Sequence, residues 1–532
     1  MNKLTVYLSF VLTIFFANNL YSQNFTHNRG EIRETLTFLA DDNMRGRGPG
    51  SLEDKESADY IASKLSEYGF KPIIGDSPLV PFNLLLYREI GFGSYLTIDG
   101  KRYVEWKDFK VHPQSPSANL STILVFPSDS AGSLNNSTIV LKTTSDSIPF
   151  IAASLKSKGV SALIINTGDK LTEERKGGTT ALSIPVILIT DETYSILKQS
   201  SRKTVDLKTV AYAVEGISYN VLMKYGREDA PLDVMIGAHY DHLGMGGPSS
   251  GSMRPKERAI HNGADDNASG VTAALETGRL LTRYADSLGI NIIIAAFGAE
   301  ERGLVGSQFI ADTLNKLKLL PNLMINLDMV GRLVESRLQI GGIGTFAEAS
   351  DVVNRSNEKY NFTLSLVQDG YGPSDHASFY NEGVPVLYLT TGVHQQYHTP
   401  DDDIELINFE GLGKISEYIA SIVTNISSSE VPKYIKTEAP PTMSQTSLKV
   451  TLGVIPDFTY EKGDGFRVGA ISSGKPAERG GMLTGDIIKK MNDRKISNIY
   501  EYMGMLGELS KGEILTLEID RKGEIINLAI QL

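Results

Sequence analysis

Five short motifs in the central part of the chain are rich in carboxylate and imidazole groups. They read GAHYDHLG, NGADDNASG, GAEERGLVGS, INLDMVGR and YHTPDD, and they begin at residues 237, 262, 298, 325 and 397. A single acidic residue at the end of a strand usually faces solvent or caps the next helix, and Asp265 alone could be such a cap. Five such places in one predicted sheet indicate a shared site.

These residue types fit a metal centre. Zinc binds histidine nitrogen and carboxylate oxygen, and a catalytic zinc leaves one position open for water. Two metal ions about 3.5–4 Å apart need a bridging carboxylate and can share one hydroxide. The chain has no cysteine, which excludes disulfides, thiolate ligands and a cysteine nucleophile. Residue types alone leave manganese and cobalt open.

The elements that carry the motifs alternate between apolar strands and helices. Residues 233–237, 292–296, 323–327, 338–340 and 384–389 read as strands, and helices are expected to begin near residues 267, 306 and 374. This alternation predicts a three-layer α/β/α domain with a mostly parallel sheet. In such sheets the site lies beyond the carboxyl ends of the strands, where the motifs stand.

The order and content of these motifs resemble the dinuclear-zinc aminopeptidase family, which also includes glutamate carboxypeptidases, transferrin receptors and glutaminyl cyclases. The resemblance covers residues 30–426, interrupted by 90–215. It implies two zinc ions per chain. His239 and Asp328 are expected to bind one, Glu301 and His398 the other, and Asp265 to bridge both. The family usually has a cis peptide after its bridging aspartate, which places that bond at Asp265-Asp266.

The resemblance also implies catalytic roles. Glu300 is the expected general base, which takes a proton from the metal-bound water and returns it to the leaving amine. Tyr397 matches a tyrosine that helps to hold the oxyanion, and Asp241 is expected to orient the His239 imidazole. The neighbouring polar residues are interpreted as supporting or surface groups: His242, His261, His376, His394, Asp375 and Asp266.

Both ends of the chain carry further signals. Lys3, the apolar run at 4–17 and the polar stretch at 18–23 predict a secretory signal peptide over residues 1–22. That run is too short to span a bilayer, so we expect a periplasmic or extracellular protein without a membrane span in its mature chain. The net charge of −11 argues against nucleic-acid binding.

Two accessory domains are expected around a catalytic domain made of residues 23–89 and 216–427. Residues 90–215 resemble a β-rich protease-associated insertion, carried by 148–166 and 183–190. After a polar linker at 428–446, residues 447–532 resemble a PDZ domain, carried by TLGV at 451 and PAERGGMLTGDII at 476. A PDZ groove can bind the C-terminus of a peptide as an added strand.

Several functions remain open on this fold. An aminopeptidase acting on peptide substrates is favoured by analogy with the family. A carboxypeptidase or dipeptidase needs an arginine for the substrate carboxylate, and Arg302 and Arg332 lie near the motifs. A glutaminyl cyclase would hold one zinc. An inactive receptor-like scaffold would lack ligands, whereas this chain has all five and Glu300.

Overall fold

The structure is a computed structural model of the chain. It describes residues 25–128, 134–143, 147–199, 203–247, 250–427, 431–438, 450–457, 460, 464–472, 474–497 and 499–532. The predicted signal peptide lies outside these residues. Among them, no helix combines the length and apolar character needed to cross a bilayer. The chain divides into one unit of residues 1–82 and 218–532 and a second of residues 83–217, close to the insertion predicted at 90–215.

A central sheet organises the first unit, with neighbouring strands in the order β17-β16-β18-β15-β13-β14-β12. The pairs β13–β14, β13–β15 and β15–β18 are parallel. The strand β16 pairs antiparallel with β18, and β12 pairs antiparallel with β14. The bounds are β12 (Ala211–Tyr225), β13 (Leu232–His239), β14 (Ile290–Phe297), β15 (Leu323–Leu327), β16 (Arg337–Gly341), β17 (Thr363–Leu366) and β18 (Val386–Thr390), and the short β1 (Lys71–Pro72) pairs with β12. The predicted mostly parallel sheet is confirmed.

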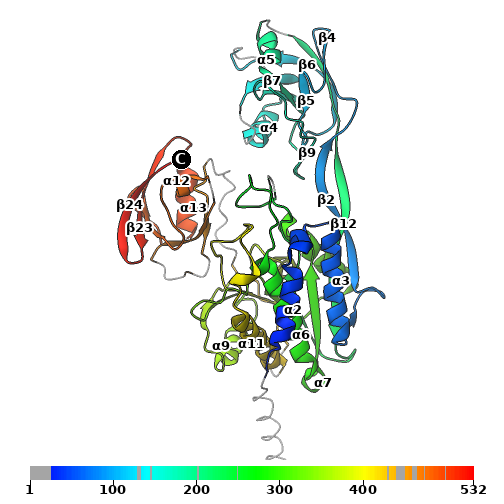
Figure 1. Cartoon of the computed structure of the whole chain (residues 1–532), viewed down its shortest axis with the longest axis vertical. Coiled ribbons are helices and arrows are strands. Elements are labelled where there is room, and N and C mark those ends of the chain that lie inside the picture. The colour runs from blue at the N-terminus through cyan, green and yellow to red at the C-terminus, as the bar shows by residue number, and fades with distance from the viewer. Residues whose placement is uncertain are drawn as a thin grey trace, which may run out of the picture. The chain divides into compact units, whose positions relative to one another are not determined.

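Helices cover both faces of this sheet, and Figure 1 labels those of one face, among them α2, α3 and α6. Alternate residues of β13 enter different cores: Val234 and Ile236 pack on one face and Met235 on the other. The first face carries α2 (Arg29–Leu39), α3 (Leu52–Glu67), α6 (Gly270–Thr282), α9 (Ala349–Asn357) and α11 (Phe409–Ser427), and the second carries α8 (Val305–Leu317) and α10 (His376–Asn381). Short helical turns are η1 (Asp42–Arg47), η3 (Ala264–Ser269), α7 (Ala285–Leu288), η4 (Glu300–Arg302) and η5 (Ile404–Leu406).

The second unit has its own sheet, in the order β4-β3-β11-β6-β7-β8-β10-β5. Its elements are β3 (Tyr95–Ile98), β4 (Lys101–Tyr103), β5 (Phe109–Val111), β6 (Ala118–Val125), β7 (Ser137–Lys142), α4 (Ile148–Lys156), β8 (Ala162–Asn166), β9 (Lys176–Gly177), β10 (Val186–Ile189), α5 (Asp191–Lys198) and β11 (Thr204–Thr209). The strands β2 (Leu79–Ile90) and β12 carry the chain into and out of it. Its identification as a protease-associated domain stays a prediction.

The C-terminal domain is a small barrel-like sheet with its own apolar core. Its strands follow the order β19-β20-β21-β23-β24, and its elements are β19 (Val454–Pro456), β20 (Phe466–Ile471), α12 (Pro476–Arg479), β21 (Ile487–Met491), β22 (Arg494–Lys495), α13 (Ile499–Glu508), β23 (Ile514–Arg521) and β24 (Glu524–Gln531). The segment before it, 431–438, is held by the catalytic domain, since Ile435 donates to the Thr345 carbonyl and the Thr437 amide to the Tyr380 hydroxyl. The predicted linker is therefore anchored over part of its length.

Candidate metal centre

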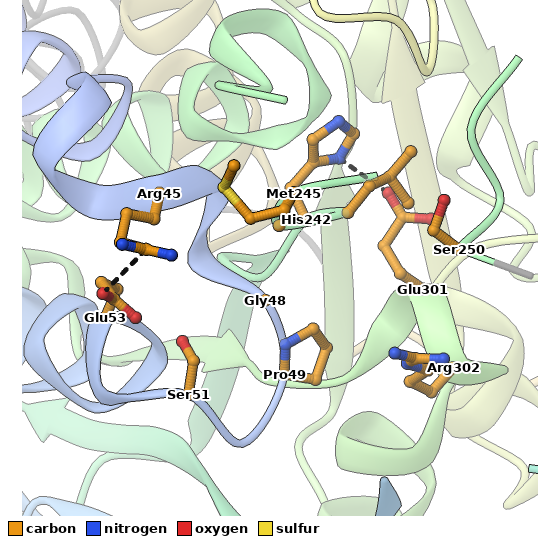
Figure 2. Close-up of a pocket in the computed structure, with 12 residues that line it drawn as sticks. Arg45, Gly48, Pro49, Ser51, Glu53, His242, Met245, Ser250, Glu301 and Arg302 are labelled. Carbon is orange, nitrogen blue, oxygen red and sulfur yellow. Dashed lines mark hydrogen bonds and ion pairs between the residues drawn. The ribbon is translucent and has the colours of Figure 1, made fainter. Parts of the chain in front are cut away.

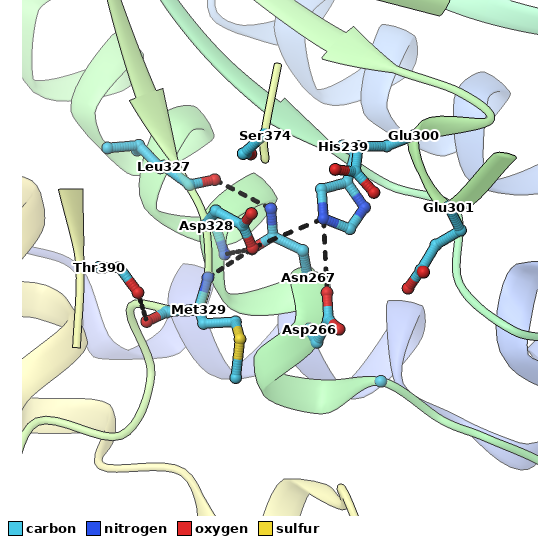
Figure 3. Close-up of polar contacts among 12 residues, drawn as sticks. His239, Asp266, Asn267, Glu300, Glu301, Leu327, Asp328, Met329, Ser374 and Thr390 are labelled. Atoms are coloured by element: carbon cyan, nitrogen blue, oxygen red, sulfur yellow. Dashed lines mark hydrogen bonds and ion pairs between the residues drawn. The ribbon is translucent and has the colours of Figure 1, made fainter. Parts of the chain in front are cut away.

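Two groups of ligand atoms meet at the carboxyl ends of the central strands. In the first, His239 Nε2 lies 3.4 Å from Asp266 Oδ1 and 3.5 Å from Asp328 Oδ1 (Figure 3). In the second, His398 Nε2 lies 3.1 Å from Asp266 Oδ2 and 3.3 Å from Glu301 Oε2. Two ligand atoms that bind one tetrahedral zinc at 2.0–2.1 Å are separated by about 3.3 Å. Both groups therefore have the spacing of a metal half-site, and Asp266 gives one oxygen to each.

The predicted bridging residue was off by one position. The structure places Asp266, and not Asp265, between the two histidines. Asp265 Oδ1 accepts the Gly331 amide at 2.6 Å and the Ser269 hydroxyl at 2.9 Å, and its Oδ2 lies 3.2 Å from His394 Nε2. The cis peptide likewise joins Asp266 to Asn267 rather than Asp265 to Asp266.

The local backbone explains this difference. Residues 264–269 form a tight turn in which Asp266 has non-helical dihedral angles of φ −105° and ψ 91°. The two neighbouring carboxylates therefore leave the turn in different directions. Asp402, which is fully buried, fixes the turn because its Oδ2 accepts the amides of both Asp265 and Asp266 at 3.0 Å. Burial, followed by the nearby charge of Asp265, raises the pKa of Asp402 to about 6. Sequence reasoning missed this residue.

Sharp turns after the strands deliver the other ligands. His239 is the last residue of β13, Asp328 directly follows β15, and Glu301 lies in the short η4 turn after β14. Ala299, immediately before Glu300, and Met329, immediately after Asp328, both have φ of 57°, and His398 has φ of 54°. Non-glycine residues adopt such angles at a cost and are enriched at functional sites. The strained turns are consistent with side chains that must reach one common point.

Asp241 supports the centre differently from the prediction. The His239 Nδ1 atom donates a hydrogen bond to the backbone carbonyl of Asp241 at 3.1 Å, whereas the Asp241 carboxylate is 3.9 Å away. That carboxylate instead accepts the amides of Glu300 at 2.9 Å and Glu301 at 3.3 Å. Asp241 therefore holds in place the turn that carries the predicted base and one ligand. Burial raises its pKa to about 8.

Glu300 and Tyr397 both lie at the centre. Glu300 groups with His239 and Asp328, their candidate ligand atoms all within 4.8 Å of one another. Burial raises the pKa of Glu300 well above its usual range, which suits a group that must exchange a proton. The Tyr397 ring stacks on His398 with 3.8 Å between ring centroids. Both predicted catalytic residues are thus beside the ligands.

The charge of the cluster fits cations. Burial lowers the pKa of His239 and His398, but the surrounding carboxylates outweigh burial and raise both well above the usual range. Burial raises the pKa of Glu301, but His398 and His242 more than offset it, and that pKa falls to about 2. The Glu301 carboxylate thus holds negative charge in a buried place, where paired or metal-bound charge is the stable arrangement. Oxygen and imidazole donors of this kind suit zinc.

The remaining polar residues named from the sequence take supporting positions. His261 contacts the Ser252 hydroxyl at 2.8 Å, and His376 stacks on Tyr388 with 4.6 Å between centroids. Burial raises the pKa of Asp375 to about 6. The last, His242, contacts Glu301 directly, with 2.8 Å between Nδ1 and Oε1.

A buried arginine ties the N-terminal loop to the centre. Arg47 is fully buried and donates to the carbonyls of Tyr240 at 2.6 Å, Asn262 at 2.7 Å, Gly263 at 3.0 Å and Leu39. Tyr240 follows the candidate ligand His239, and Gly263 directly precedes the turn that carries Asp266. One guanidinium therefore crosslinks two ligand-bearing segments.

We expect Arg47→Lys to lower the free energy of unfolding by about 2–4 kcal/mol, because a lysine cannot reach all four carbonyls and each buried polar group left unpaired costs about 1–3 kcal/mol. Urea unfolding followed by circular dichroism measures this difference. Arg45→Lys is the matched control, since the Arg45 side chain is 60% exposed. Equal stability of the two variants would contradict the crosslinking role.

A cavity of about 300 Å³ opens next to the second half-site. Its wall includes His242, Glu301 and Arg302, and it continues along the loop from Arg45 to Glu53 (Figure 2). Arg45 lies 3.5 Å from Glu53, whereas Arg302 is exposed at the rim. Arg332 is placed elsewhere: it donates to Gln396 at 3.0 Å.

Two groups of candidate ligands that share one aspartate, at the strand ends of an α/β sheet, have the arrangement expected of a metal-dependent hydrolase. Residues 220–423 match the model of Peptidase family M28, and residues 450–532 match the PDZ domain model. The chain thus contains an M28-type peptidase domain followed by a PDZ domain, as the motifs predicted.

Named relatives agree with this family. Aminopeptidase YwaD of Bacillus subtilis is 31% identical over 272 residues, which are 48% of this chain and 54% of that protein. Leucine aminopeptidase 1 of Uncinocarpus reesii is 29% identical, over 33% of this chain and 47% of that protein. The chain thus spans about half the length of these relatives. The structure of BSAP, a zinc aminopeptidase from Bacillus subtilis, shares the fold with a TM-score of 0.50 at 23% identity, covering 78% of this chain and 100% of that chain.

Proposed function

We propose that this chain is an exported zinc-dependent aminopeptidase that removes N-terminal residues from peptides and holds two zinc ions. The observation that carries the proposal is the position of Asp266, with one oxygen toward each histidine-carboxylate half-site. The aminopeptidase names of the family relatives support the reaction. Export rests on the N-terminal sequence alone.

Each residue of the candidate metal centre has a proposed role. His239 and Asp328 would hold one zinc, His398 and Glu301 the other, and Asp266 both. Bound zinc supplies an activated water and polarises the scissile carbonyl. Glu300 accepts a proton at its carboxylate and returns it to the leaving amine. Asp241 keeps Glu300 in position through the backbone amide of Glu300, and Tyr397 would donate to the developing oxyanion.

Metal content and substrate choice together test this proposal. The mature chain is purified, its bound metals are counted, and peptides with free or acetylated N-termini are compared as substrates. Two zinc ions per chain and cleavage of free-amine peptides alone are expected. One zinc with cyclisation of N-terminal glutamine would indicate a cyclase, and bound metal without turnover would indicate a scaffold.

The cavity favours a second candidate, an exopeptidase that recognises a substrate carboxylate. Arg302 lines the cavity beside Glu301, as Figure 2 shows. Guanidinium groups bind carboxylates with two parallel hydrogen bonds. A dipeptidase or carboxypeptidase would use such a contact at the C-terminus of its substrate.

On this second candidate, Arg302→Gln is expected to raise KM for dipeptides with a free C-terminus by about 10–100-fold, because a hydrogen bond to a charged group contributes about 1.5–3 kcal/mol. The kcat should stay within a factor of about 3, and C-terminally amidated substrates should be unaffected. Arg283→Gln, an exposed residue after α6, is the matched control. An unchanged KM for free dipeptides would leave the aminopeptidase as the sole candidate.

The PDZ domain is proposed to bind peptide C-termini. Its Leu452-Gly453 loop precedes β19, and Gly453 has φ of 74°, an angle that suits glycine. A peptide strand could be added along β19, the strand at the edge of this sheet. We propose that the unit of residues 83–217 is a protease-associated domain.

A further inference from the structure

A third histidine stands at the candidate metal centre without an assigned role. His242 is fully buried, and its Nδ1 lies 2.8 Å from Glu301 Oε1. Its ring makes an edge contact with His398, with 5.6 Å between centroids and an interplanar angle of 71°. His242 therefore touches two residues of the second half-site.

His242 groups with Asp266 and Glu301 as a candidate metal ligand, but its distances to them differ from those between two ligands of one ion. Two atoms bound to one tetrahedral zinc are about 3.3 Å apart, as His398 Nε2 is from Glu301 Oε2 at 3.3 Å. His242 Nδ1 is closer to Glu301 Oε1, at a hydrogen-bond distance, and farther from Asp266 Oδ2, at 3.8 Å. Glu301 thus turns Oε2 toward His398 and Asp266, and Oε1 toward His242.

The hydrogen-bond partners of the two imidazole nitrogens agree with this arrangement. His242 Nε2 is buried and has no hydrogen-bond partner among the described residues. With a proton on Nδ1, the ring donates to the carboxylate and leaves only an acceptor unpaired. With the proton on Nε2 instead, a buried N–H would lack an acceptor and the Nδ1 lone pair would face a carboxylate oxygen. The first tautomer is the favoured one.

The ring is also held in place by packing. A Cβ added at Gly263 would lie 2.5 Å from His242 Cδ2, so the backbone there approaches the ring more closely than a side chain allows. Gly263 directly precedes the turn that carries Asp266. The imidazole is therefore confined between that turn and the Glu301 carboxylate.

We infer that His242 is a positioning residue, which donates from Nδ1 to Glu301 Oε1 and so presents Oε2 to the second metal ion. The inference rests on the proposed two-metal centre. The histidines of both half-sites are supported by backbone carbonyls, those of Asp241 for His239 and Gly251 for His398, whereas His242 supports a carboxylate of the second half-site. Loss of the His242 side chain should thus weaken the binding of one of the two metal ions and leave the binding of the other unchanged.

Zinc titration of the metal-stripped full chain tests this inference. Wild type, His242→Ala and His242→Asn are titrated with zinc by calorimetry in the presence of a competing chelator. Asparagine keeps an N–H donor near the position of Nδ1. His261→Asn is the matched control, since His261 is a buried histidine that contacts Ser252 and the Ala259 carbonyl. Cobalt substitution adds an absorption spectrum that reports the ligands.

We expect His242→Ala to lower the affinity for one of the two zinc ions by about 10–100-fold, which is the usual effect of losing a group that orients a ligand. The zinc affinity of His242→Asn should stay within a factor of about 5 of wild type, well below the loss expected for alanine. Its cobalt spectrum should be unchanged. If the alanine variant does not fold, His242→Phe, which has similar volume and no donor, replaces it.

Two results would overturn the inference. In the first, the alanine variant binds both ions like wild type. In the second, the asparagine variant is as weak as the alanine variant and its cobalt spectrum changes, which would make His242 a ligand. Failure of the wild type to bind two ions would instead refute the proposed centre itself, so the two failures are distinguishable.

Discussion

Asp266→Asn is expected to remove at least one of the two zinc ions and to lower kcat/KM by on the order of 10³-fold or more. The Asp266 carboxylate gives one oxygen to each half-site, and an amide cannot serve as an anionic bridge between two cations. A metal ion contributes several kcal/mol to stabilising the transition state, and each 1.36 kcal/mol is a factor of ten in rate. Elemental analysis of the purified variant and peptide hydrolysis measure both effects.

The neighbouring residue provides the control. Asp265→Asn is expected to keep both zinc ions and to retain activity within a factor of about 10, roughly the loss of one neutral hydrogen bond. Its carboxylate accepts from Gly331 and Ser269 through Oδ1, which an asparagine oxygen can replace. If Asp265→Asn lost the metal while Asp266→Asn kept it, the original assignment of the bridge would be correct and the geometry wrong.

The sequence was sufficient for the architecture. The strands predicted at 292–296 and 323–327 lie within or match β14 and β15, because long buried apolar runs between helical patterns have few alternative structures. The motif order predicted the fold and the family, and both are confirmed. The structure also gathers His239, Glu301, Asp328 and His398 at one place.

Direction within a turn could not be predicted. Asp265 and Asp266 are adjacent and chemically identical, so only the dihedral angles of the turn decide which carboxylate reaches the histidines. The resemblance assigned the bridge to Asp265, the first of the two adjacent aspartates in the motif. Only the structure shows that the cis peptide joins Asp266 to Asn267 and that Asp266 is the aspartate between the two histidines.

The supporting contacts were also beyond the sequence. Asp402 reaches the amides of Asp265 and Asp266 across 137 and 136 residues. His242 reaches Glu301 across 59 residues. Such contacts depend on loops that meet only after the sheet has formed, and no local pattern encodes them. The Asp241 carboxylate shows the same limit, because its amide partners at Glu300 and Glu301 belong to another strand end.

Glu300→Gln is expected to lower kcat by about 10²–10⁴-fold while both zinc ions stay bound, because a positioned acid–base group contributes that factor. Glutamine fills the same space and keeps the backbone bond to Asp241, but it cannot carry the proton. Single-turnover hydrolysis and metal analysis separate the chemical step from metal loss. Glu358→Gln, an exposed residue at the end of α9, is the control and should match wild type.

The alternative assignment makes the opposite prediction. Glu300 also lies within ligand distance of His239 and Asp328, so it could act as a metal ligand rather than a base. In that case Glu300→Gln would lose a zinc ion in parallel with activity, and added zinc would restore part of the rate. The fully buried Asp241 already fixes the Glu300 amide, and His239 already has ligand-spaced partners in Asp266 and Asp328. The first half-site is therefore complete without Glu300, which leaves that carboxylate available to exchange a proton.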